Sequence, residues 1–109
     1  MHPRMTLLSA GLCLLSAPVL AAEDVTTVPY LCDHGARVSA TYINSGTDSF
    51  AVVTFEGRQI GFAIAQSASG ARYESRDAAQ PFVWWSKGDQ AMMLFGAEET
   101  PVYSECVPE

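Results

Sequence analysis

The sequence has little of what a metal site or an enzyme active site is built from. Its 109 residues include two histidines and three cysteines, and no cysteine pair has the spacing of zinc ligands. No glycine-rich phosphate loop precedes a helix. His34, beside Asp33 and Gly35, is interpreted as a turn residue, without the motif of a Ser–His–Asp triad around it. We therefore expect no metal, no cofactor and no catalytic residue.

Basic residues are also scarce. Lys and Arg together number six, against twelve Asp and Glu. A nucleic-acid binder needs a basic face, so this class of protein is excluded. An acidic surface commonly serves solubility, but it also attracts a cationic partner over long range.

Long apolar runs are absent as well, and no membrane span is expected. The apolar run over residues 7–15 is too short to cross a bilayer; it follows a basic start and precedes small residues, as in a secretory signal peptide. We expect cleavage after Ala21 or Ala22. The organisation is then a signal peptide over 1–21 and one domain over 22–109.

Cys13 raises the question of a lipid anchor. A lipidated cysteine follows a small residue, whereas Leu12 precedes Cys13, and Cys13 comes before the apolar run has ended. Anchoring is therefore not expected, and we place the exported chain in the periplasm. Loss of the signal peptide removes Arg4 and no acidic residue, which changes the net charge from −6 to −7.

Two cysteines remain in the exported domain, Cys32 and Cys106, near its opposite ends. An even pair in an exported chain predicts a disulfide. The bond would close a loop of over seventy residues, worth about 4 kcal/mol in the chain-entropy model. A domain this small buries only ~60–65% of its unfolded surface, so the bond would matter to its stability.

Residue patterning predicts short antiparallel strands, with no helical period of useful length. Alternating polarity, β-branched residues and glycine-containing turns mark the strands. The expected strands lie near 28–32, 36–44, 49–55, 60–66, 71–75, 82–86, 91–95 and 102–106. We predict an all-β fold, a small antiparallel β-barrel of about eight strands stapled by one disulfide, because closure hides the strand edges.

A barrel of eight strands is just wide enough for side chains to fill its interior. The predicted filling is Val38, Tyr42, Val52, Ile60, Phe62, Ile64, Met92, Leu94 and one of Trp84 and Trp85. The two tryptophans face opposite sides because they are neighbours on a strand. Two alternative functions stay open: a lipocalin-like barrel that binds a small ligand in a cavity, and a cell-wall carbohydrate-binding module that uses the outer tryptophan for stacking.

Two polar turns carry the remaining chemistry, in "SASGARY" (67–73) and "WWSKGDQAMML" (84–94). A catalytic dyad of Ser69 and Lys87 would need a lysine of depressed pKa in a water-poor site. Both residues lie at turn tips beside glycine, where solvent keeps the lysine charged. We therefore expect no enzyme.

These segments resemble the two signature segments of the MliC/PliC family, bacterial inhibitors of c-type lysozyme: a Ser-Gly-x-x-Tyr turn, then a Lys-Gly turn that enters a strand with Ala. "YLCDHG" (30–35) and Cys106 are similar to the opening and closing segments of the family. The resemblance covers essentially the whole exported domain. It implies an eight-stranded barrel and a cationic protein partner, c-type lysozyme. The oligomeric state stays open, a homodimer included.

The resemblance also implies a contact set for lysozyme. Its members are Ser69, Gly70, Arg72, Tyr73, Lys87 and Gly88. Ser69 and Lys87 would enter the enzyme's cleft, and the glycines would let the backbone turn sharply. Arg72 would lie at the rim, and Tyr73 would either line the contact or, as we favour, pack beneath the turn. Residues 74–82 are long for this family, and an outward bulge there would shift Ser69 relative to Lys87.

Overall fold

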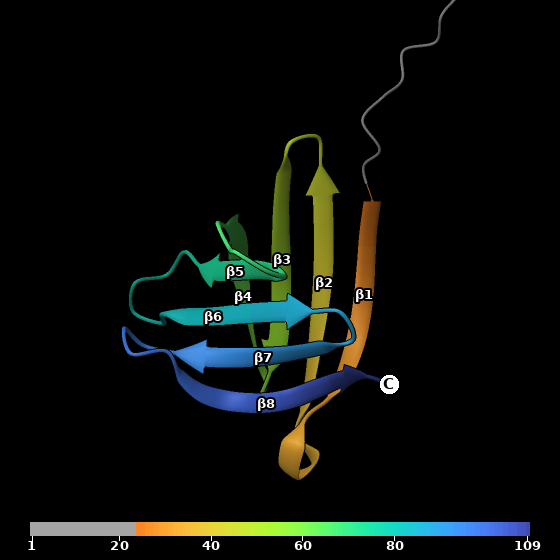
Figure 1. The fold of residues 1–109 in the computed structure, drawn as a ribbon, viewed down its shortest axis with the longest axis vertical. Coiled ribbons are helices and arrows are strands. Elements are labelled where there is room, and N and C mark those ends of the chain that lie inside the picture. The colour runs from red at the N-terminus through yellow and green to blue at the C-terminus, as the bar shows by residue number, and fades with distance from the viewer. Residues whose placement is uncertain (1–23) are drawn as a thin grey trace, which may run out of the picture.

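A computed structural model describes residues 24–109; the predicted signal peptide, its cleavage site and Cys13 lie outside this range. Eight strands form one closed antiparallel barrel, in which β1 pairs with β8, and this confirms the predicted fold (Figure 1). The elements are β1 (Asp24–Leu31), the short 3-10 helix η1 (Asp33–Gly35), β2 (Arg37–Ser45), β3 (Asp48–Phe55), β4 (Arg58–Ala65), β5 (Ala71–Ser75), β6 (Phe82–Lys87), β7 (Gln90–Phe95) and β8 (Thr100–Pro108). Within the described range no helix has the length and apolar character to cross a bilayer.

The barrel has two differently oriented halves. Figure 1 shows β1, β2 and β3 running vertically in the view, whereas β5 to β8 run across them. The β2–β3 hairpin projects beyond the crossing strands, and the β6–β7 turn lies at the side of the molecule. The strands of the second half carry both motif turns.

The interior is filled by aromatic and aliphatic side chains. Trp84 is fully buried and meets Tyr30 edge-to-face at 5.2 Å between ring centroids. Its indole Nε1 donates a hydrogen bond to the hydroxyl of Tyr42 (2.8 Å), which is also bonded to the hydroxyl of Tyr30 (2.8 Å). Burial raises the pKa of Tyr30 and of Tyr73. The indole N–H of Trp84 and the hydroxyls of Tyr30 and Tyr42 thus all have hydrogen-bond partners, as polar groups in a stable core require.

The predicted filling is only partly right. Val38, Ile60, Phe62 and Trp84 are buried in the core, and Tyr42 packs against it. The prediction is wrong for Val52, Ile64 and Met92. Val52 and Met92 are only partly buried, Ile64 is 43% exposed, and Leu94 is buried outside the core cluster.

The errors on β3 and β7 have one physical reason. Both strands are apolar at consecutive positions, so alternation cannot tell which set faces inward. On β3 the inward set is Ala51, Val53 and Phe55. On β7 a register shift between Ala91 and Leu94 further breaks the alternation.

The predicted disulfide is confirmed. Cys32 and Cys106 are bonded across a sequence separation of 74 residues, and both are buried. The bond adjoins the seam where β1 meets β8 through only two residue pairs, Tyr30 with Pro108 and Leu31 with Val107. The covalent link therefore reinforces the shortest strand pairing of the barrel.

Candidate functional site

The topology brings the two motif turns to the same end of the β5–β6 hairpin. Gly70 directly precedes β5, and Lys87 ends β6. Because the two strands are antiparallel, with Ala71 opposite Ser86, the start of one lies beside the end of the other. Residues 18 positions apart in the sequence, Ser69 and Lys87, thus belong to adjoining turns.

The Ser69 turn is held by local hydrogen bonds. The Ser69 amide donates to the Ser67 hydroxyl (3.3 Å), and this hydroxyl donates to the Ser69 carbonyl. Such serine turns fix the backbone without a regular ladder. Among residues 24–109 the Ser69 side-chain hydroxyl makes no hydrogen bond, so it is available to an outside partner.

The Lys87 turn is a tight hairpin. Lys87 pairs with Gln90, which leaves Gly88 and Asp89 as a two-residue loop. Gly88 has φ +58° with open space around it, so the backbone conformation, not crowding, favours glycine. Lys87 is exposed and forms no ion pair within the described chain. Its ammonium therefore has no counterion in the part of the chain that the structure describes.

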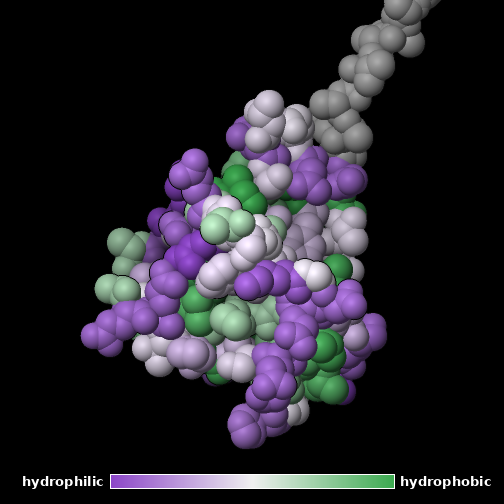
Figure 2. Space-filling model, viewed as in Figure 1, coloured by the Kyte–Doolittle hydropathy of each residue, from purple (hydrophilic) through white to green (hydrophobic). Residues whose placement is uncertain are grey.

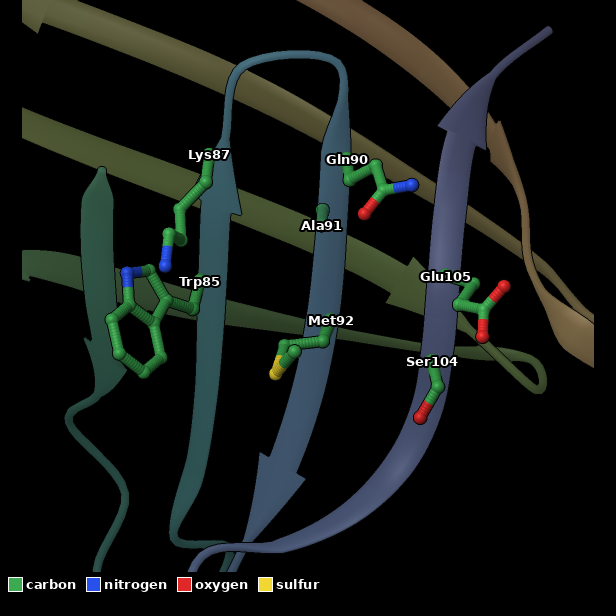
Figure 3. Close-up of a pocket in the computed structure, with 7 residues that line it drawn as sticks. All are labelled: Trp85, Lys87, Gln90, Ala91, Met92, Ser104 and Glu105. Atoms are coloured by element: carbon green, nitrogen blue, oxygen red, sulfur yellow. The ribbon is translucent and has the colours of Figure 1, made fainter. Parts of the chain in front are cut away.

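Trp85 lies between the two turns. Its indole Nε1 donates to the Ser69 carbonyl (3.0 Å), and the Lys87 Nζ lies 5.2 Å from the ring centroid. Figure 3 shows the lysine side chain folded back along β6 toward the indole. The outer tryptophan is therefore Trp85, partly buried under a neighbouring loop, while Trp84 is the core member.

Arg72 lies on the outer face of β5, opposite Trp85 on β6. Its guanidinium bonds both carboxylate oxygens of Glu99, one at 3.1 Å, and one oxygen of Glu74 at 3.2 Å. The Glu99 hydrogen bond raises the pKa of Arg72, and the same contact lowers the pKa of Glu99. Glu99, in the turn between β7 and β8, was not found from the sequence, since only the fold brings it to β5.

Tyr73 is 6% exposed and packs inside the barrel against Tyr42, at 5.7 Å between ring centroids. This agrees with the favoured expectation that it packs beneath the turn.

The long connection over residues 76–81 lies at the other end of the β5–β6 hairpin. The Ser75 hydroxyl closes it by donating to the Gln80 carbonyl (2.6 Å) and accepting from the Phe82 amide (3.1 Å). The pairing from Ala71 to Glu74 runs without a register shift. The extra residues therefore lie at the end of the hairpin away from Ser69 and Lys87, and the strand pairing beside both turns is regular.

A groove of about 360 Å³ opens beside Lys87 on the outside of the barrel. Its lining is Trp85, Lys87, Gln90, Ala91, Met92, Ser104 and Glu105 (Figure 3). It forms where the β7–β8 ladder changes register and Glu105 adopts φ +50°. Sequence reasoning missed it, because no residue pattern marks the bulge.

A metal site on the described surface would need a cluster of metal-ligating side chains. Residues 24–109 contain no group of three metal-ligating side chains. Figure 2 shows hydrophilic side chains over most of the visible face, with apolar patches between them. The tip presents a hydroxyl and an ammonium that form no side-chain hydrogen bond or ion pair within residues 24–109.

Known proteins share this sequence and fold. The family model described as membrane-bound lysozyme-inhibitor of c-type lysozyme matches residues 30–101. The chain is 36% identical over 80 residues to the membrane-bound lysozyme inhibitor of C-type lysozyme of Pseudomonas aeruginosa, and 36% identical over 86 residues to that of Cupriavidus necator. These matches span 72% and 76% of this chain but only 60% and 66% of the relatives' own lengths.

Two solved structures resemble the barrel. The periplasmic lysozyme inhibitor PliC-St of Salmonella typhimurium has a TM-score of 0.71 at 24% identity, with 79% of this chain and 99% of that chain covered. Pseudomonas aeruginosa MliC, solved in complex with hen egg white lysozyme, has a TM-score of 0.64 at 31% identity, with 92% and 98% covered. The chain therefore belongs to the MliC family of lysozyme inhibitors, as the resemblance of its motif turns predicted.

Proposed function

We propose that this chain inhibits c-type lysozyme by placing Ser69 and Lys87 in the enzyme's active-site cleft. One observation carries the proposal: two turns from different parts of the chain adjoin at one exposed tip, with the Ser69 hydroxyl and the Lys87 ammonium both unengaged by polar partners within the described chain. The relatives support the choice of partner, since they are described as inhibitors of C-type lysozyme.

The chemistry of such a tip suits a lysozyme cleft. A retaining glycosidase of this kind uses two carboxyl groups, one protonated as the general acid and one ionised. An ammonium placed between them would pair with the ionised group and favour loss of the acid's proton. The Ser69 hydroxyl would donate to the same oxygens, and the two turns would exclude the polysaccharide.

The rest of the molecule fits this role. The exported domain carries a net charge of −7 once the signal peptide and Arg4 are removed. Opposite charge speeds encounter with a basic protein such as lysozyme. A closed, disulfide-linked barrel holds the tip in place before binding, so less conformational entropy is lost on association.

The proposal places the protein in the periplasm, as a domain over 22–109 released from a signal peptide over 1–21. The relatives are described as membrane-bound or periplasmic. In the periplasm the inhibitor would meet lysozyme before the cell wall is cut.

The two alternative functions have less support. Trp84, Tyr30 and Tyr42 occupy the barrel interior with their polar atoms bonded to one another, which argues against a cavity for a small ligand. The Trp85 ring is approached by Lys87 and Arg72, which argues against a free platform for a sugar.

The test is the clearing of a bacterial cell-wall suspension by hen egg white lysozyme in the presence of purified residues 22–109. We expect micromolar inhibitor to slow the loss of turbidity. An unchanged rate would remove the proposed function. A parallel sedimentation with peptidoglycan alone checks the carbohydrate-binding alternative, which predicts that the protein is retained without lysozyme.

A further inference from the structure

We propose that Trp85 is a positioning residue that holds both inhibitory turns in their binding geometry. The inference rests on the proposed function, which it deepens. No motif reasoning assigned a role to this side chain beyond packing or stacking. Its place in the structure is specific, since one indole contacts residues of both turns and a third group braces it from β5.

The first contact fixes the serine turn. The Trp85 Nε1–H donates to the Ser69 carbonyl at 3.0 Å, across 16 positions in the sequence. This carbonyl also accepts from the Ser67 hydroxyl, so the Ser69 backbone is bonded from two sides. Because the Ser69 backbone is fixed, its side chain starts from a defined position. The Ser69 hydroxyl itself makes no hydrogen bond within residues 24–109 and can bond a partner.

The second contact supports the lysine. The Lys87 Nζ lies 5.2 Å from the Trp85 ring centroid, within the range of a cation–π interaction. At an exposed site this attraction is weak, so the ammonium can leave the ring for a carboxylate pair. The ring thus narrows the positions that a flexible lysine side chain samples without trapping it.

The third contact holds the tryptophan itself. The guanidinium of Arg72 lies 5.5 Å from the same ring centroid. Arg72 is bonded to Glu99 and Glu74, which offset its charge near the Lys87 ammonium. The outer face therefore carries a connected chain of contacts from the β7–β8 turn through β5 to the inhibitory tip, and Trp85 is its last member.

The experiment measures the inhibition constant against hen egg white lysozyme for Trp85→Phe and Trp85→Ala. Trp85→Phe keeps an aromatic ring but loses the N–H, and should weaken inhibition about fivefold, the worth of one ordinary hydrogen bond. Trp85→Ala loses the ring as well and should weaken it about thirtyfold. The matched control is Phe50→Ala, another outer aromatic, on β3 and 40% exposed, which should leave inhibition unchanged.

A double-mutant cycle separates positioning from general destabilisation. If Trp85 acts partly through Lys87, Trp85→Ala should weaken inhibition about fivefold in a Lys87→Ala background, clearly less than in the wild type. Equal factors in both backgrounds would overturn the inference, as would Trp85→Phe inhibiting like the wild type. Trp85→Phe decides the matter even if Trp85→Ala does not fold.

A structural measurement separates failure of the proposed Trp85 role from failure of the proposed lysozyme inhibition. The chain has two tryptophans, so a ¹⁵N-labelled sample gives two indole N–H signals, and Trp85→Phe assigns them. We expect the Trp85 signal to exchange slowly with solvent because it is hydrogen-bonded; fast exchange would overturn the inference while leaving lysozyme inhibition intact. A wild-type protein that does not slow lysozyme would overturn the proposed function and this role with it.

Discussion

The backbone of Gly70 packs directly against the side chain of Lys87. A Cβ at position 70 would lie 2.3 Å from the Lys87 Cγ and 2.5 Å from the Ser86 carbonyl oxygen. Real Cβ atoms do not come that close, and Gly70 also has φ +68°, which disfavours any side chain. The serine turn and the lysine turn are therefore packed against each other, and a side chain at position 70 would displace Lys87 or Ser86.

Gly70→Ala should weaken lysozyme inhibition roughly tenfold or more, equivalent to about 1.4 kcal/mol of binding free energy. The added methyl group must displace either the Lys87 stem or the strand end at Ser86, and both changes misplace the inhibitory pair. The inhibition constant measures the effect. Inhibition by Gly70→Ala equal to that of the wild type would show that the packing of the two turns does not matter for binding.

Gly46→Ala is the matched control for this variant. Gly46 has φ +61° in the β2–β3 turn, and nothing lies within 4 Å of an added Cβ. The backbone strain, about 1 kcal/mol, is thus similar in the two variants, and only the clash differs. We expect thermal unfolding to show both variants destabilised by the strain, Gly70→Ala further by the clash, and inhibition to fall in Gly70→Ala alone.

Lys87 is the only lysine in the sequence, which permits a chemical test. Acetylation of the folded protein modifies this amine and the α-amino group. It should weaken inhibition by about tenfold or more, because loss of a charge pair in a desolvated cleft leaves a carboxylate unpaired. Lys87→Ala should have the same effect and leave the α-amino group unmodified.

Arg76→Ala shows whether net charge alone explains such a loss. Arg76 is exposed in the connection at the far end of the β5–β6 hairpin, and its removal changes the net charge by the same amount. We expect it to change the association rate slightly and the dissociation rate not at all. Removing either cation makes the chain more acidic and so favours encounter with a basic lysozyme; equal losses for Lys87→Ala and Arg76→Ala would therefore mean that Lys87 makes no specific contact in the cleft.

The fold could be predicted further than the site. Strand positions, closure and the Cys32–Cys106 bond follow from local patterning and export, and the structure confirms them. The phase of β3 and β7 could not be predicted, because consecutive apolar residues such as Val52 and Val53 fit either face of a strand. Which residues of a strand face the barrel interior is decided only when the neighbouring strands are paired with it.

The same limit applies to the site. The motif turns identified Ser69 and Lys87, but they did not reveal that Trp85 contacts both residues or that Glu99 holds Arg72. These contacts join residues that are distant in sequence, and each depends on strand register. From its residue type, Arg72 is expected to lie as a cation at the rim of the lysozyme contact. In the structure its charge is already paired with Glu74 and Glu99.

The Arg72–Glu99 pair gives stability a specific pH dependence. Arg72 lowers the pKa of Glu99 in the folded state, so the pair stabilises the fold fully above the ordinary glutamate pKa. The stabilisation is lost as the pH falls through the lowered, folded-state value, because the carboxyl group is then protonated in both states. Since Glu99 is 41% exposed, we expect a modest contribution, about 0.5 kcal/mol at neutral pH.

Glu99→Gln tests this expectation. Urea unfolding at pH 7 should show the variant less stable than the wild type, and the difference should shrink as the pH falls through the lowered, folded-state pKa of Glu99 and its carboxyl group becomes neutral. The neighbouring Glu98→Gln is the control, since Glu98 forms no ion pair within residues 24–109 and should give no such trend. A difference between Glu99→Gln and wild type that persists unchanged at acid pH would mean that the side chain stabilises the turn by packing rather than by its charge on Arg72.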